Sequence, residues 1–246
     1  MKQNQNDLTT TQTLNEKWDH ATLANNFIFY KVMRHHPQAC KQLLELLLGI
    51  KISQIEITNE ETIEVDYDSK GIRLDVYVKD TTNLYDIELQ IVNTKELPER
   101  ARYYQGLMDL DTLKSGEKYK KLKNSHIIFI CMDDIFNHNM PIYTFENLCL
   151  ENNKIKLNDR SFKHFFIAPI CATLVDNKDI RDFFNFLISN KASNKFTSEL
   201  HNYVADAKHN MQWRIQYMTY ERQRAYDLEE GMNRKAIEAA RSFYEN

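Results

Sequence analysis

The stretch Ser125–Met132 constrains the fold most, because four consecutive apolar residues, Ile127–Ile130, leave no polar face for solvent. A run this short and this apolar predicts a strand that is buried on both faces, as in the interior of a parallel or mixed sheet. Helical patterns over residues 22–33, 38–48 and 99–114 can cover such a sheet. We therefore expect an α/β fold with a central mixed sheet flanked by helices.

Other strand and helix patterns divide the chain into three parts. Alternating apolar residues predict strands at Ile52–Ile57, Ile63–Tyr67, Ile72–Val78, Leu84–Val92, Ile142–Leu148 and Phe162–Ile167. From about Asp179 the pattern is helical, with predicted helices at Arg181–Ser189, Ser198–Tyr220 and Asp227–Glu245. We expect a flexible segment over residues 1–21, a mixed α/β domain over 22–175 and an α-helical C-terminal extension over 176–246.

Composition excludes several classes of protein. The net charge of −3, with 42% hydrophobic and 27% charged residues, is that of an ordinary soluble protein, so nucleic-acid binding would need a local basic patch. The five glycines stand far apart, which excludes a phosphate-binding loop. No apolar run reaches the ~20 residues of a membrane span, and we expect a cytoplasmic protein. The cysteines form no CxxC pair and are expected to be buried small residues: Cys40, Cys131, Cys149 and Cys171.

Two acidic residues stand in the middle of the two best strand patterns. Asp75 lies between aliphatic neighbours, and thirteen residues later Glu88 does too. Acidic residues are poor strand formers, and in a hairpin these two carboxylates would stand side by side. Their repulsion would raise a pKa unless a cation lay between them. Mg²⁺ takes oxygen ligands from one or two carboxylates and keeps several waters, and Gln90 on the same face is expected to position one of those waters.

Six short motifs follow in a fixed order: Asn26–Met33, Arg73–Val76, Asp86–Gln90, Pro98–Tyr104, Gly116–Tyr119 and Ile128–Cys131. Together they resemble the PD-(D/E)XK nuclease superfamily and, more narrowly, its transposase-like members, the recombination-promoting nucleases. The resemblance covers about residues 22–145. It implies a restriction-endonuclease-like core and metal-dependent endonuclease activity on DNA, linked to recombination or mobile elements. Mg²⁺ is the implied ion, although Mn²⁺ or Ca²⁺ would suit the same ligands.

The resemblance also implies roles for individual residues. Asp75 and Glu88 match the metal-binding carboxylates, and Gln90 stands where the superfamily has lysine, so the positive charge of that lysine is missing. Arg100 and Tyr104, four residues apart, share a helix face; they match the family's helix motif and are expected to contact the scissile phosphate. Glu45 is a candidate third carboxylate, because some nucleases of this superfamily place a glutamate on their first helix.

Other interpretations of the same residues stay open. Asp75 and Glu88 could be ordinary hairpin residues, Arg100 a surface partner of Glu96, and Tyr104 a packing aromatic. The lysines over residues 114–123 form either a solvated surface or a DNA contact. Residues 133–138 offer carboxylates and a histidine, but a strand-end loop explains them better.

Two other functions also fit the sequence. The chain could be a nucleic-acid-binding or protein-interaction module that has lost catalysis, or a nuclease directed at RNA. Cleavage of both DNA strands would favour a homodimer, assembled through the tail helices.

Overall fold

The computed structural model describes residues 13–57, 62–63 and 72–244 of the chain. It divides into two compact units: Thr22–Val204, and a second unit that joins the described residues before Thr22 to those after Val204. The larger unit therefore continues past the predicted boundary at residue 175. The remainder of the predicted flexible segment, residues 1–12, lies outside the described residues.

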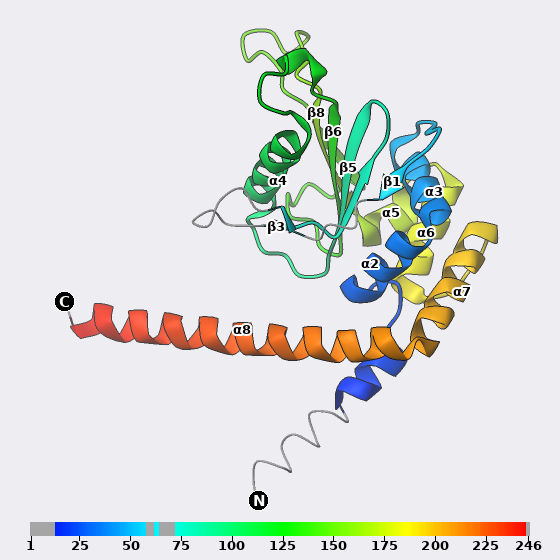
Figure 1. Cartoon of the computed structure of the whole chain (residues 1–246), viewed down its shortest axis with the longest axis vertical. Coiled ribbons are helices and arrows are strands. Elements are labelled where there is room, and N and C mark those ends of the chain that lie inside the picture. The colour runs from blue at the N-terminus through cyan, green and yellow to red at the C-terminus, as the bar shows by residue number, and fades with distance from the viewer. Residues whose placement is uncertain (1–12, 58–61, 64–71, 245–246) are drawn as a thin grey trace, which may run out of the picture. The chain divides into compact units, whose positions relative to one another are not determined.

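A six-stranded mixed sheet forms the centre of the larger unit, in the order β1-β4-β5-β6-β8-β7 (Figure 1). Its strands are β1 (Glu56–Ile57), β4 (Val76–Lys79), β5 (Asn83–Gln90), β6 (Asn124–Cys131), β7 (Ile142–Phe145) and β8 (Ser161–Ile167). The central strands β5, β6 and β8 are parallel, and β1, β4 and β7 run antiparallel to their neighbours. The short strands β2 (Thr62–Ile63) and β3 (Ile72–Arg73) pair separately.

Helices cover both faces of this sheet. Figure 1 shows α4 (Leu97–Thr112) on one face and, on the other, α2 (Asn26–His35), α3 (Pro37–Leu48), α5 (Ala168–Leu174) and α6 (Lys178–Ser189). The short 3-10 helix η1 (Tyr119–Lys121) precedes β6, and α7 (Lys195–His209) follows α6. The expected α/β fold is thus confirmed.

The apolar strand has the environment that its sequence predicts. All residues of β6 from Ile127 to Cys131 are buried, with Ile127 and Phe129 packed against Leu97, Ala101 and Met108 of α4. Three of the four cysteines are buried without disulfides, as expected, while Cys149 is half-buried. No helix among the described residues has the length and apolar character that crossing a membrane requires.

Several predicted elements have different limits in the structure. The predicted strand Ile72–Val78 is interrupted, because Ile72 and Arg73 pair with β2 and the main sheet resumes only at Val76. The predicted strand Ile63–Tyr67 falls mostly outside the described residues. Helix α5 was not predicted, because its seven residues are too few to show a helical period. The last two helices divide at Asn210, whose side chain accepts a hydrogen bond from the Trp213 N–H at the start of α8 (Met211–Tyr244).

In the smaller unit, residues 13–20 are helical and lie against α8. Trp18 is fully buried, its ring centroid is 5.2 Å from that of Tyr217, and its indole N–H donates to the Lys208 carbonyl. Residues 13–20 of the predicted flexible segment therefore form a helix. Arg214 adds hydrogen bonds to the Asn15 side chain.

Two histidines on neighbouring strands predict an acid-sensitive stability. His126 Nδ1 lies 3.1 Å from His164 Nε2, and burial lowers the pKa of both residues to about 4. The unfolded chain, with histidine pKa values near 6.5, binds protons that the folded chain refuses, so stability falls as the pH falls from 6.5 toward 4. We expect this pair to lose about 4 kcal/mol of stabilisation between pH 7 and 5, about 2 kcal/mol for each histidine, measured by urea unfolding. His126→Phe should lose less unfolding free energy over this pH range, and His138→Gln, a change at an exposed histidine, should lose as much as wild type. If the free energy of unfolding changed equally with pH in all three proteins, the prediction would be wrong.

Candidate active site

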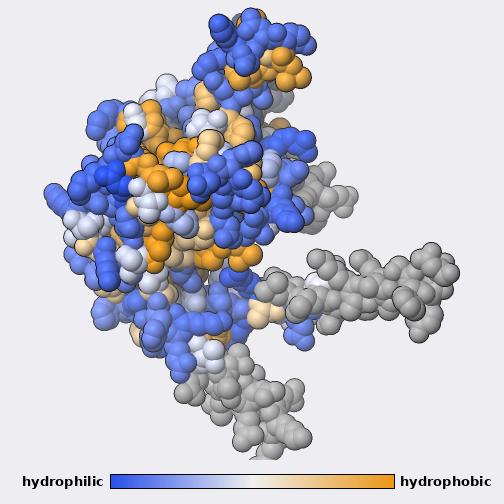
Figure 2. All heavy atoms as spheres, turned by 180° about the vertical axis from the view of Figure 1, so that it is seen from behind, coloured by the Kyte–Doolittle hydropathy of each residue, from blue (hydrophilic) through white to orange (hydrophobic). Residues whose placement is uncertain are grey.

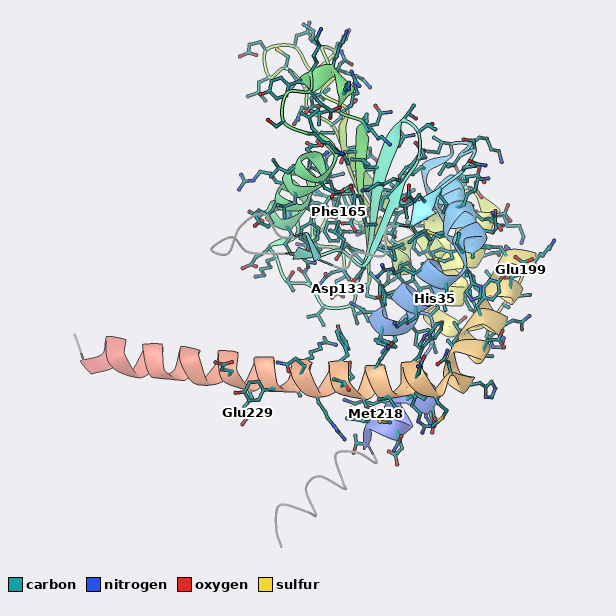
Figure 3. All side chains as sticks on the ribbon, in the orientation of Figure 1. His35, Asp133, Phe165, Glu199, Met218 and Glu229 are labelled. Carbon is teal, nitrogen blue, oxygen red and sulfur yellow. The ribbon has the colours of Figure 1, made fainter. Side chains whose placement is uncertain are left out.

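Strand β5 presents a row of polar side chains to α4. Side chains alternate along a strand, so Asp86, Glu88 and Gln90 lie on the face that α4 covers, the same face as Phe129 and Phe165 on the next strands. Phe165 is labelled in Figure 3. The alternating pattern of β5 is usual for a strand with one solvated face, but Asp86 is 0% and Glu88 4% exposed. Both faces of β5 are buried, because it is a central strand with helices on each side.

Asp75 is opposite Glu88. The β4–β5 register pairs Val76 with Ile87, and continuing it by one residue places Asp75 across from Glu88. The Asp75 N–H donates a 2.9 Å hydrogen bond to Glu88 Oε1. Asp75 lies in the bend just before β4 rather than in mid-strand, and its side chain is half-buried. The structure therefore brings together the two carboxylates that the sequence predicts as metal ligands.

Helix α4 adds a guanidinium to these carboxylates. Arg100 donates from Nη2 to Glu88 Oε2 at 3.2 Å and from Nη1 to Gln90 Oε1 at 2.9 Å. Its Nε and Nη2 donate to the Tyr104 hydroxyl at 3.2 and 2.9 Å. The four residues thus form one hydrogen-bonded network, and Arg100 pairs with Glu88 rather than with Glu96.

Asp86 is the residue of this site that the sequence interpretation left without a role. Its side chain is fully buried, and no N–H or hydroxyl group of a described residue donates to its carboxylate oxygens. Its polar neighbour is the Glu88 carboxyl group, and the two can share a hydrogen bond only when one of them is protonated. Burial, and then the charge of Asp75, raise the pKa of Asp86 well above its usual value; burial, Asp75 and Asp86 do the same to the pKa of Glu88. The sequence holds one sign that Asp86 belongs to the site, which is that it precedes Glu88 by two residues and so shares its face of the strand.

The donor set fits a divalent cation. Three carboxylates and one guanidinium leave a formal charge of −2, and a buried carboxylate without a partner is costly unless it is protonated or meets a cation. The side-chain atoms that these three carboxylates offer to a metal are all oxygens, which hard cations prefer. No three histidine, cysteine or acidic side chains among the described residues, these carboxylates included, form a group that could hold a metal ion. A Mg²⁺ ion bound by only two of them would keep several of its waters.

Glu45 is not brought to these carboxylates. It belongs to α3, on the face of the sheet opposite α4 (Figure 1). Its Oε1 accepts a 2.8 Å hydrogen bond from the Ile52 N–H and lies 3.5 Å from Lys41 Nζ, and the first of these contacts is the main cause of its lowered pKa. Its local contacts account for this glutamate without a metal.

The loop after β6 is a strand-end loop, as the better interpretation of its sequence held. Asp134 accepts hydrogen bonds from the Phe136 and Asn139 N–H groups and from the Tyr143 hydroxyl, which fix the turn. Asp133 is exposed at the C-terminal edge of the sheet (Figure 3). The Asp134 carboxylate is therefore committed to the loop.

The lysine-rich segment lies at the other end of the sheet. Lys123 Nζ donates to the Asp80 carbonyl, before the start of β5, whereas Gln90 is the last residue of β5. Eight residues of strand separate the two ends by roughly 25 Å. The lysines therefore do not adjoin the carboxylates, although both flank α4 in the sequence. Near these lysines the β7–β8 connection exposes Leu148, Leu150, Ile155 and Leu157, and Figure 2 shows hydrophobic residues among hydrophilic ones on this part of the surface.

Comparison with known proteins gives one family. The family model described as PD-(D/E)XK nuclease family transposase matches residues 33–239, which is most of the chain and includes every residue of the network. Searches of curated proteins and of solved structures give no match.

Proposed function

The chain belongs to the PD-(D/E)XK nuclease family transposases, and on that premise we propose that it is a metal-dependent DNA endonuclease with its metal at Asp75 and Glu88. The observation that carries the proposal is the formally −2 cluster on β5 and β4, in which the buried Asp86 carboxylate has no hydrogen-bond donor among the described residues. A divalent cation is the simplest group that relieves this charge. Mg²⁺ is the proposed ion, with Mn²⁺ as a substitute.

Each side chain then has a task in phosphodiester hydrolysis. A metal ion bound here would lower the pKa of a bound water and neutralise phosphate charge. Asp75 and Glu88 hold the ion, and Asp86 supplies further negative charge beneath them. Arg100, whose side chain is 30% exposed, is placed to contact the scissile phosphate, and the Tyr104 hydroxyl fixes the orientation of the guanidinium.

Plasmid nicking by the purified protein with Mg²⁺ or Mn²⁺ tests this function. We expect nicking that requires the metal and that disappears in Asp75→Ala. Glu99→Gln is the matched control, because Glu99 is exposed on α4 beside the site and should leave nicking unchanged. Nicking by Asp75→Ala at the wild-type rate would sink the proposal. A wild-type protein that binds DNA without cutting it would instead favour the binding module.

We also propose that the lysine-rich segment contacts the DNA backbone away from the site. Residues 114–123 hold five lysines against one glutamate, and Lys118 and Lys120 make no ion pair with a described residue. Each lysine-to-phosphate contact contributes about one unit to the slope of log affinity against log salt. Lys118→Ala with Lys120→Ala should lower that slope by about two, measured on catalytically inactive protein by fluorescence anisotropy. An unchanged slope would show that the segment is a solvated surface.

A homodimer is the proposed assembly, through the exposed part of α8. Ile215 and Tyr226 are 62% and 63% exposed on this helix, and one site cuts one strand. Light scattering at micromolar concentration should give twice the 29.3 kDa of one chain. A single-chain mass at that concentration would contradict the dimer.

A further inference from the structure

Gln90 lies on the same face of β5 as Glu88, at the position where a lysine would supply a positive charge. Both ends of its side-chain amide are hydrogen-bonded. Its Oε1 accepts from Arg100, and its Nε2 donates to the Val92 carbonyl. A guanidinium has only donors and a carbonyl only accepts, so these two neighbours fix which way the amide points. An amide held in this way orients the arginine, whereas the sequence suggested that it positions a water.

Arg100 reaches the same place from α4. Its Nη1 and Nη2 donate to Gln90 and Glu88, which are two residues apart on β5, so the guanidinium lies across the end of the strand. Its planar fork has five N–H groups. Four are used by Glu88, Gln90 and Tyr104, and the second N–H of Nη1 has no acceptor among the described residues.

Arg100 is charged, reachable and held in place. A guanidinium stays protonated at any ordinary pH, and the Arg100 side chain is 30% exposed. The ring centroids of Tyr104 and Phe129 lie 5.3 and 5.7 Å from the guanidinium carbon and limit its rotation. A fixed, permanently charged donor with one open N–H is suited to an anionic oxygen.

We propose that Arg100 supplies the positive charge that stabilises the developing phosphate charge, and that Gln90 is the positioning residue that aims it. This inference rests on the proposed nuclease function. It assigns to a helix residue the charge that a lysine at position 90 would provide. It also predicts that a lysine at position 90 on β5 can replace the positive charge of Arg100 on α4.

Four variants test the assignment by single-turnover cleavage of a DNA duplex with Mn²⁺. Arg100→Ala should lower the cleavage rate about 100-fold or more, in the range for loss of one transition-state donor. Gln90→Ala should lower it about tenfold with less effect on DNA affinity. Adding Gln90→Lys to Arg100→Ala should recover at least about tenfold of the lost rate. Arg102→Ala is the matched control, an exposed arginine two residues along the same helix, and should cleave like wild type.

Metal binding gives a readout that does not depend on activity. Removing the positive charge of Arg100 from beside the carboxylates should strengthen Mn²⁺ binding, by about threefold or more in calorimetric titration. A purely structural role for Arg100 would weaken it instead, because the site would be disordered. Circular dichroism and thermal unfolding establish that each variant is folded.

The outcomes separate the two proposals. Wild-type protein that binds Mn²⁺ but does not cleave overturns the nuclease function, and the charge assignment fails with it. If the wild-type protein cleaves DNA and the rate of Arg100→Ala is within threefold of the wild-type rate, only the charge assignment is overturned. Weaker Mn²⁺ binding by Arg100→Ala, or no recovery from the added lysine, also overturns the assignment and leaves the nuclease in place.

Discussion

Replacing Glu88 by glutamine is expected to reduce metal-dependent DNA cleavage roughly 1000-fold or more. The variant keeps the size of the side chain but removes the charge that holds the cation between β5 and Asp75. Its single carbonyl oxygen can accept from the Asp75 N–H or from Arg100, but not from both as the two carboxylate oxygens do. The metal site and the anchor of Arg100 are therefore lost together. Cleavage rates across a range of Mn²⁺ concentrations measure the effect.

The same variant should remain folded, which makes it a sharp test. Loss of one of three neighbouring carboxylates relieves repulsion in the metal-free protein, so its melting temperature should equal or exceed that of wild type without metal. Glu99→Gln makes the same chemical change at an exposed site and should leave cleavage and melting unchanged. Full rescue of Glu88→Gln by excess Mn²⁺ would mean that Glu88 only tunes affinity. If Glu88→Gln cleaved at the wild-type rate without excess Mn²⁺, the metal would have to bind elsewhere.

The second large effect is on the contribution that Asp86 and Glu88 make to the stability of the metal-free protein, which should fall as the pH rises above about 4. It is opposite in sign to the contribution of His126 and His164, and the difference between wild type and Asp86→Asn isolates it. The pKa values of Asp86 and Glu88 are raised in the folded state, so the folded chain holds protons that the unfolded chain, with pKa values near 4, releases. The stability from these protons is complete below pH 4 and is lost as the pH rises through the raised values. This slope is opposite to that of an ordinary salt-bridged carboxylate.

A divalent cation should restore the stability lost at neutral pH. At 100 times its dissociation constant, a ligand specific to the folded state adds about 2.7 kcal/mol, or about 5–10 °C in melting temperature for a chain of this size. Thermal unfolding at pH 8 with Mg²⁺ or with EDTA measures this increment. Asp86→Asn should be more stable than wild type in EDTA and gain less from Mg²⁺. Equal increments in the two proteins would show that Asp86 does not sense the cation.

Much of the site follows from local geometry that a sequence reveals. Residues two apart on a strand share a face, and residues four apart on a helix do too. The sequence alone therefore pairs Glu88 with Gln90 and Arg100 with Tyr104. The opposition of Asp75 and Glu88 required only that a hairpin form. The apolar run of β6 predicted a covered sheet for the same reason, because its composition leaves no solvated face.

The rest depends on which elements pack against which. The alternation of β5 is the same whether its polar face meets water or α4, so the burial of Asp86 could not be predicted from the pattern. Glu45 was predicted by analogy with a glutamate on the first helix, but α3 packs on the opposite face of the sheet, where the Ile52 N–H binds its carboxylate. The break between α7 and α8 depends on one cap, Asn210, within a continuous helical pattern.

The network around Glu88 comes from thirty consecutive residues, Asp75 to Tyr104. Only the β4–β5 turn and residues 91–96 have to close for these side chains to meet, and short loops close at little entropic cost and within microseconds. Pairing β8 with β6 instead joins segments more than thirty residues apart, which is slower. During folding, the carboxylates and their arginine can therefore gather as a local unit before the sheet is complete, and a cation present at that stage would act on the folding pathway as well as on its product.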